Sequence, residues 1–168
     1  MLHAALWQPV IPQNVGNIAR TCVGMDAHLH VVGPTIIDFD DKAVKRAGLD
    51  YWDDLRFTLH ATPEDFFAWL AAEGKTPWLI TKHGQARFDQ PAYADGEVFL
   101  FGSEREGLPQ EIHARHPGRG LSIPIPGQVR SYNLGNTVAI MLATAMSKAA
   151  LWPQEWAPKA GYDTKNTF

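Results

Sequence analysis

The chain has 168 residues, of which 45% are hydrophobic and 20% charged, and it carries a formal net charge of −3 with a pI near 6.1. This length suffices for one domain with a core of its own, without disulfides or metal. The slightly acidic balance excludes a protein that binds nucleic acid through overall positive charge, so any RNA contact has to use a local basic patch.

Cysteine content and hydropathy indicate a soluble, cytoplasmic protein. The single cysteine, Cys22, has no Cys or His partner at metal-ligand spacing, which fits a reducing compartment and argues against a structural zinc. The most apolar run, residues 137–146, is about half of the ~20 residues that a membrane helix requires. The N-terminus lacks the basic start of a signal peptide. We therefore expect no membrane partner and no bound metal.

Apolar runs with strand character alternate with helical patterns along the chain. We expect strands at residues 2–7, 28–32, 56–59, 77–81, 97–101 and 123–125, and helices at 16–25, 41–47, 63–72, 109–114 and 137–146. Strands separated by helices predict an α/β fold, with a mainly parallel sheet that helices cover on both faces. One domain over residues 1–150 accounts for all of these elements.

A tail over residues 151–168 follows the last predicted helix and contains Trp152 and Trp156 among prolines. Exposed tryptophans are costly. We therefore expect the tail to dock on the body of the protein or on a partner subunit, and to be partly disordered where it does not dock.

Polar residues gather in three loops that follow predicted strands. The first runs from Gln8 to Arg20 with two prolines and two asparagines, which we expect to delay the helix. The second is Phe101–Pro109, and the third is Ser131–Asn136, between an apolar strand and a nearly all-apolar helix. Since ligands of an open parallel sheet bind outside the carboxyl ends of its strands, the three loops predict a ligand site.

The second loop has glycines at the spacing of a phosphate-binding loop, Gly102 and Gly107. Leu108 and Pro109 stand where such a loop requires Lys and Ser or Thr, which excludes a Walker-type NTPase. No G-x-G-x-x-G follows a strand, so the Rossmann fingerprint is absent as well. Taken alone, the loop is either a close approach of backbone to a small ligand or simply the entry to a helix.

Together the three loops resemble, in order and spacing, the three sequence motifs of the SpoU branch of the SPOUT RNA methyltransferases. Asn14–Arg20 is similar to the first motif, Phe101–Pro109 to the second, and residues 123–125 with Ser131–Asn136 to the third. The resemblance extends over residues 1–150. It implies a homodimer and a parallel sheet whose C-terminal part is tied in a deep trefoil knot, which no hydrophobic pattern would predict.

Within this family the chain most closely resembles the minimal tRNA (cytidine/uridine-2′-O)-methyltransferases, because it carries little beyond the catalytic core and has a similar segment at residues 41–51. The resemblance implies an S-adenosylmethionine (SAM)-dependent enzyme that methylates the ribose of the wobble nucleotide, cytidine or modified uridine, of leucine tRNAs. Glu106, Tyr132 and Gly135 depart from the usual motif wording, which affects the expected substrate contacts rather than the reaction class.

Three alternatives stay open beside this hypothesis. The enzyme could methylate another tRNA or rRNA position. The chain could be a non-catalytic RNA-binding module on the same fold. A small-molecule α/β enzyme that uses another nucleotide is a third class, but it lacks a fingerprint of its own.

SAM as the methyl donor requires backbone hydrogen bonds and an apolar slot for adenine. The resemblance assigns cofactor binding to Leu79, Gly102, Glu104, Gly107, Ile123, Ser131, Leu134 and Asn136. Glu104 is the one acid firmly inside a motif. It could face the sulfonium, but we favour a structural role in which it accepts backbone N–H bonds at a helix entry.

Methyl transfer to a ribose 2′-oxygen depends on holding donor and hydroxyl in line and close. The resemblance assigns removal of the hydroxyl proton to Arg20, yet a guanidinium is protonated at neutral pH and is a poor base. We therefore favour positioning of the target phosphate by Arg20 and keep the base role as the alternative. Asn14, Ser131 and Asn133 would then fix the ribose and phosphate by hydrogen bonds.

Basic residues for RNA are few. Lys42, Lys45 and Arg46 share one face of a predicted helix, and Arg130 precedes the third motif. We predict RNA binding by Lys42, Arg46 and Arg130, with a purely solvated helix face as the alternative. None of the seven histidines lies within a motif, and His83, the nearest in principle, is expected to be an exposed loop residue.

Overall fold

Seven parallel strands form one sheet in the computed structural model, which describes residues 1–39 and 52–155. The strand order is β3-β2-β1-β6-β4-β7-β5, and every pairing is parallel. The elements are β1 (His3–Trp7), α1 (Pro12–Gly24), β2 (His28–Val32), the 3-10 helix η1 (Trp52–Asp54), β3 (Phe57–His60), α3 (Pro63–Ala72), β4 (Trp78–Ile80), β5 (Ala86–Arg87), β6 (Val98–Phe101), α4 (Gln110–Arg115), β7 (Gly120–Ser122) and α5 (Leu134–Lys148).

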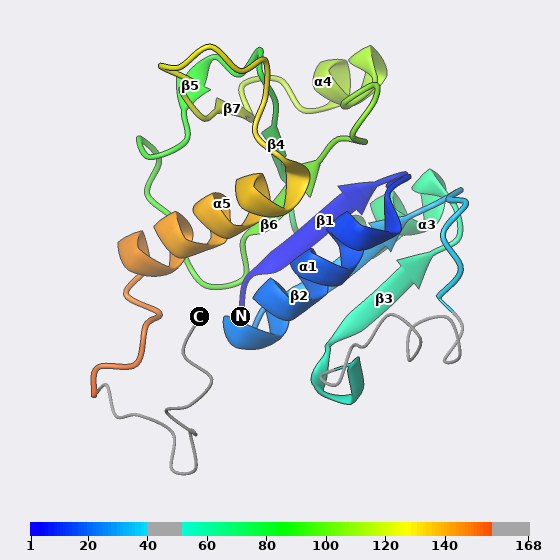
Figure 1. The fold of residues 1–168 in the computed structure, drawn as a ribbon, viewed down its shortest axis with the longest axis horizontal. Helices are drawn as coiled ribbons and strands as arrows, with labels where there is room; N and C mark the ends of the chain where they lie inside the picture. Colours follow the sequence, from blue (N-terminus) through cyan, green and yellow to red (C-terminus); the bar gives the residue numbers. More distant parts are fainter. Residues whose placement is uncertain (40–51, 156–168) are drawn as a thin grey trace.

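Helices cover both faces of the sheet, as the α/β alternation predicts. Side chains alternate along each strand, so Ala4 and Leu6 of β1 join the apolar layer of α1 and α5, whereas Ala5 and Trp7 join that of α3 and α4. Figure 1 shows α1 and α5 side by side in front of the sheet, with α3 behind it. Because both faces are buried, the central strands β1 and β6 are buried along their whole length and are apolar except for His3.

Helix α1 begins at Pro12, four residues before the predicted start at Gly16. The prediction was wrong because proline does not delay this helix. Pro12 is at the first helical position, where its fixed φ suits a helix and its missing N–H would have no partner in the helix anyway. Helix α3 starts at Pro63 as predicted, with a capping box between Thr62 and Asp65.

The segment before α5 also differs from the prediction. The strand is β7, Gly120–Ser122, rather than residues 123–125, because Pro124 and Pro126 have no N–H to donate to a sheet. Helix α5 begins at Leu134 rather than Thr137, so half of the polar cluster forms the first turn of that helix. The sequence reasoning missed β5, which has only two residues and pairs with β7.

Two predicted segments fall partly or wholly outside the described residues. The helix expected at 41–47 lies outside them, as does the tail beyond residue 155. In the described part of the tail, Trp152 is 42% exposed and its indole N–H donates to Ser147 Oγ at 2.9 Å. The division between a domain at 1–150 and a tail stays a prediction.

Among the helices of residues 1–39 and 52–155, none combines the length and apolar character needed to cross a bilayer.

Candidate active site

A cavity of about 510 Å³ lies at the carboxyl ends of β4, β6 and β7, a volume typical of small-molecule sites. Four segments far apart in the sequence form its walls: the start of α1, the loop after β4, the loop after β6 and the segment between β7 and α5. The lining residues are Ile11, Asn14, Ile80–His83, Phe101–Leu108, His113, Ile123, Ile125, Ser131–Leu134 and Thr137. All three predicted loops therefore border one cavity.

Glu104 ties the second loop to the start of α1. Its carboxylate accepts hydrogen bonds from the backbone N–H groups of Val10, at 3.0 Å, and Ile11, at 3.3 Å. Residue Ile11 is the N-cap of α1 and has no polar side chain to cap the helix. A carboxylate near a helix N-terminus also interacts favourably with the helix dipole. These bonds agree with the structural role favoured from the sequence.

Asn14 connects Glu104 to the third loop. Its amide Nδ2 donates to Glu104 Oε1 at 3.0 Å, and its Oδ1 accepts from Asn133 Nδ2 at 2.9 Å. The Oδ1 of Asn133 in turn accepts from the backbone N–H groups of Gly135, at 2.8 Å, and Asn136, at 3.4 Å, which caps α5. One hydrogen-bonded network, Glu104–Asn14–Asn133, thus joins the three loops.

The buried position of Asn14 makes this network important for the shape of the cavity. Asn14 is only 6% exposed, so its amide has few chances to replace a lost partner with water. A buried polar group without a partner costs about 1–3 kcal/mol. The network therefore fixes where the starts of α1 and α5 lie relative to the loop after β6.

The loop after β6 folds tightly on itself, which explains its two glycines. Ser103 and Gly107 form an isolated antiparallel bridge, with N–O distances of 3.1 and 3.0 Å. Gly107 has φ +74°, a conformation that favours glycine. A Cβ on Gly102 would lie 2.3 Å from the carbonyl carbon of Gly107, so only glycine fits there. The loop presents backbone, rather than side chains, at close range to the cavity.

Six of the eight predicted cofactor residues line the cavity: Gly102, Glu104, Gly107, Ile123, Ser131 and Leu134. Leu79 does not, because its side chain is fully buried in the apolar layer under α3. Its neighbours Ile80 and Thr81 line the cavity instead. Asn136 is exposed in the first turn of α5 and is also absent from the lining.

Three of the four predicted catalytic residues, Asn14, Ser131 and Asn133, lie at the cavity. Arg20 does not line it. Its position on α1 is six residues beyond Asn14, and it is exposed. The structure therefore brings together the residues expected to hold the ribose and separates them, within one chain, from the arginine.

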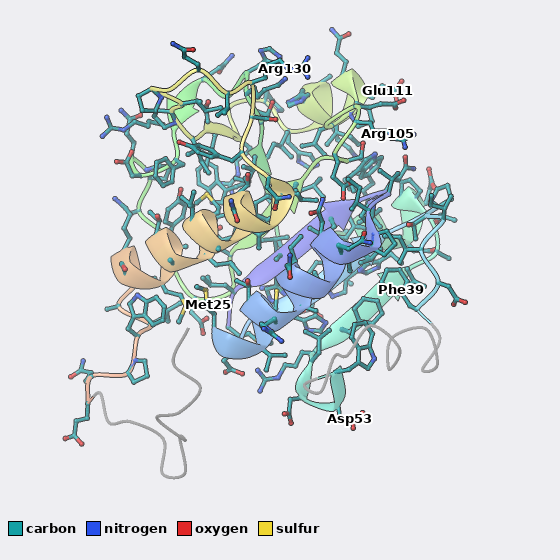
Figure 2. All side chains as sticks on the ribbon, viewed as in Figure 1. Met25, Phe39, Asp53, Arg105, Glu111 and Arg130 are labelled. Atoms are coloured by element: carbon teal, nitrogen blue, oxygen red, sulfur yellow. The ribbon has the colours of Figure 1, made fainter. Side chains whose placement is uncertain are left out.

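The predicted RNA contacts are placed only in part. Arg130 is exposed on the segment before α5, while Lys42 and Arg46 lie outside the described residues. Sequence reasoning missed Arg105, which is exposed and lines the cavity. Figure 2 shows Arg105 and Arg130 at the same end of the molecule, where α4 lies. Its place inside the second motif was the signal that could have identified Arg105.

The loop after β4 also forms a wall of the cavity, although it lies outside the three motifs. Thr81, Lys82 and His83 line the cavity, and His83 is exposed as predicted. Its position at the carboxyl end of a predicted parallel strand was the signal that could have identified this loop as part of the site. Tyr132 also lines the cavity, and its hydroxyl donates a hydrogen bond to the carbonyl oxygen of Pro124 at 3.3 Å, which fixes a side chain at one of the unusual motif positions.

Comparison with known proteins places this chain in a family. Residues 1–143 match the model of the SpoU rRNA Methylase family. The tRNA (cytidine(34)-2′-O)-methyltransferase of Burkholderia cenocepacia is 38% identical over 153 residues, which cover 89% of this chain and 96% of that protein.

Solved structures agree with this match. One structure, described as giving insights into the 2-OH methylation of C/U34 on tRNA, has a TM-score of 0.80 and 38% identity over 88% of this chain and 90% of its own. An AdoMet-bound rRNA methyltransferase from Sinorhizobium meliloti has a TM-score of 0.74 and 30% identity over 87% of this chain and 56% of its own.

Proposed function

Because the chain belongs to the SpoU rRNA Methylase family, we propose that it transfers the methyl group of SAM to the ribose 2′-oxygen of the wobble nucleotide, cytidine or modified uridine, of leucine tRNAs. The observation that carries this proposal is the single cavity that the Glu104–Asn14–Asn133 network assembles from three separate motifs. The choice of position 34 is supported by the name of the Burkholderia relative, whose alignment covers 89% of this chain and 96% of that protein.

The residues of the cavity suit SAM. Ile80, Phe101, Ile123 and Ile125 offer an apolar slot of the kind that adenine needs, and the folded Gly102–Gly107 loop offers backbone donors and acceptors beside it. When bound there, SAM supplies an activated methyl group on a positively charged sulfur. AdoMet in the Sinorhizobium meliloti relative supports this choice of cofactor, and no residue assigned to the reaction calls for a metal.

The chain's own groups then orient the acceptor. In the transfer, the carbon–sulfur bond breaks, a carbon–oxygen bond forms, and the ribose hydroxyl loses its proton. Ser131 and Asn133 at the cavity rim would hold the ribose, and Arg105, Arg130 and Arg20 would pair with phosphates, since guanidinium groups suit phosphate oxygens. Exposed Arg20, outside the lining, fits a role on the RNA better than a role on SAM.

Three further features belong to the same proposal. The strand order β6-β4-β7, in which β4 lies between two later strands, is compatible with a C-terminal trefoil knot. The family resemblance supports a homodimer with each site near the partner subunit. A tRNA substrate supports a cytoplasmic location.

Labelled SAM and undermethylated tRNA, followed by mapping of the methylated ribose, test the proposal. We expect label at the 2′-oxygen of nucleotide 34 in leucine tRNAs. Label at another tRNA or rRNA position would show that the proposed substrate is wrong and that the proposed reaction is right. RNA binding with no transfer under these conditions would favour the non-catalytic module instead.

A further inference from the structure

Four histidines meet on the face of the sheet that α3 covers, away from the cavity. His3 lies on β1, His28 and His30 on β2, and His60 on β3. His3, His30 and His60 are buried, and His28 is half-buried. Neither the proposed reaction nor any of the three motifs uses these side chains.

Strand geometry brings three of the rings together. His28 and His30 are two residues apart on one strand, so both side chains point to the same face. His3 is directly opposite His28 on the neighbouring strand. As a result, one ring nitrogen from each of His3, His28 and His30 lies within 4.8 Å of one from each of the other two.

Two of these nitrogens already have the spacing of ligands to one ion. His3 Nδ1 and His30 Nε2 are 3.0 Å apart. Two ligand nitrogens on a tetrahedral zinc with bonds of about 2.0 Å are separated by roughly 3.3 Å. An ion between them would replace the hydrogen bond that joins these two nitrogens, and His28, whose ring stacks on His30 with centroids 4.2 Å apart, would have to turn toward the ion.

Neighbouring groups fix the rings from outside. His30 Nδ1 contacts His60 Nε2 at 3.0 Å, and His28 Nε2 contacts Thr58 Oγ1 at 2.9 Å. These contacts occupy one nitrogen of His30 and one of His28. They leave His28 Nδ1 for another partner, whereas His30 Nε2 would have to exchange its contact with His3 Nδ1 for the ion. Metal-binding histidines commonly donate their second ring N–H to such a group, which fixes the tautomer and the ring orientation.

We propose that His3, His28 and His30 form a binding site for a divalent transition-metal ion, of which Zn²⁺ is the representative. Neutral imidazoles without a thiolate or carboxylate suit zinc, copper and nickel. His28 is only half-buried, so we expect water from this side to supply a fourth ligand. This proposal concerns a different face of the molecule from the methyl-transfer cavity and does not depend on the proposed reaction.

The electrostatic surroundings set the expected strength of binding. The proton in the hydrogen bond between His3 Nδ1 and His30 Nε2 has to move to the other nitrogen of its ring, or leave, before both nitrogens can bind one ion. Lys75 and Arg56 add positive charge near the rings and oppose a divalent ion. We therefore expect micromolar rather than nanomolar affinity.

The test is equilibrium dialysis of untagged, full-length protein against Zn²⁺, with bound metal measured by atomic emission. Wild type should bind one Zn²⁺ per chain, and His28→Gln and His3→Gln should each lose this saturable binding. Thr58→Val, which removes only the group that orients His28, should weaken binding by about 10- to 100-fold. Replacing Zn²⁺ with Co²⁺ should give the visible absorption of a four-coordinate nitrogen site.

His83→Gln is the matched control, because His83 is exposed and lies outside the cluster. It should bind Zn²⁺ as wild type does. Circular dichroism melting separates loss of a ligand from loss of the fold, and the half-buried His28 is the safer of the two ligand positions to change. No saturable binding by wild type, or wild-type binding by a folded His28→Gln variant, would overturn the proposal.

Discussion

The cavity at the carboxyl ends of the strands and the histidine cluster under α3 are assembled in opposite ways. The cavity takes whole loops from the sequence, each polar and each following a strand, and joins them through the Glu104–Asn14–Asn133 network. The cluster takes single side chains, such as His3 and His30, from within buried strands. The residues of a functional loop are consecutive, so they form a motif that can be recognised in the sequence. Strand pairing, in contrast, can bring together residues that form no sequence motif.

The two regions also differ in how they should respond to change. The cavity depends on backbone shape and on directed hydrogen bonds, so single substitutions there should affect binding and activity. The cluster is largely buried, and burial lowers the pKa of its histidines, so the proton concentration should affect it through the stability of the fold. The following experiments separate these two kinds of dependence, from the largest expected effect to the smallest.

Arg20→Ala should lower methyl transfer by about 100-fold or more while leaving SAM affinity nearly unchanged, because misplacing the acceptor has an effect of that size. Steady-state transfer and calorimetric SAM titration measure the two quantities. Arg87→Ala is the control, since Arg87 is exposed on the edge strand β5 and pairs with Asp89. Wild-type turnover in Arg20→Ala would refute any role of Arg20 in the reaction.

Gly102→Ala should weaken SAM binding by at least about tenfold, which corresponds to 1.4 kcal/mol. The added Cβ would meet the backbone of Gly107 at 2.3 Å and force the loop to open. Gly127→Ala is the matched control, because a Cβ there would meet nothing within 4 Å. Equal SAM affinity in the two variants, measured by calorimetry, would show that the folded loop is not part of the cofactor site.

Asn14→Ala should destabilise the protein by about 1–3 kcal/mol, since it removes two hydrogen bonds, to Glu104 and from Asn133, each worth about 0.5–1.5 kcal/mol. Urea unfolding measures the change. Asn17→Ala, three residues along the same helix and exposed, should change stability far less. If both variants unfold at the same urea concentration, the network contributes nothing to holding α1 and α5.

Acid should destabilise the metal-free protein through the histidine cluster. Burial lowers the pKa of His30 from 6.5 to about 2, so below pH 6.5 the unfolded chain binds protons that the folded chain does not. Stability should therefore fall progressively as the pH drops from 6.5, and be fully retained above it. Lys75, Arg56 and the Met1 amino group add positive charge around the rings, and Asp65 beside His60 adds negative charge.

Melting temperatures from pH 7.5 to pH 5 measure this effect. A folded His28→Gln variant should show a shallower decrease, because burial lowers the pKa of His28 as well, whereas exposed His83→Gln should follow wild type. A melting temperature independent of pH over this range would contradict the neutral, buried state of the cluster.

The smallest expected effect concerns the single thiol. Burial raises the pKa of Cys22 to about 12, so the native protein should not react with iodoacetamide at pH 8, while the unfolded chain should. Mass spectrometry of the treated protein measures this difference. Rapid alkylation without denaturant would show that the apolar layer between α1 and the sheet opens readily.

Much of the fold could be predicted because the long elements have strong local patterns. The apolar runs of β1 and β2 and the Pro63 start of α3 are visible in the sequence. The boundaries near prolines were less predictable: Pro12 starts a helix that we expected it to delay, and Pro124 ends a strand that we expected to include it. Short β5 has too few residues to form a pattern.

The candidate site was predictable as a set of loops but not as a set of contacts. Leu79 was assigned to SAM through the family resemblance. The alternation of the strand turns its side chain toward α3, and its neighbours Ile80 and Thr81 line the cavity. The bond between Asn14 and Asn133 spans 119 positions, and no local pattern encodes it. The histidines were dismissed because none lay in a motif, although the His-x-His spacing of His28 and His30 on a strand was already visible.

The structure of the protein crystallised with SAM tests the central claim most directly. We expect SAM in the cavity at the ends of β4, β6 and β7, with its adenine in the apolar slot and contacts to all three motifs, from Asn14, the Gly102–Gly107 loop and the Ser131–Leu134 segment. SAM bound elsewhere, or a cavity that stays empty at saturating SAM, would contradict the account.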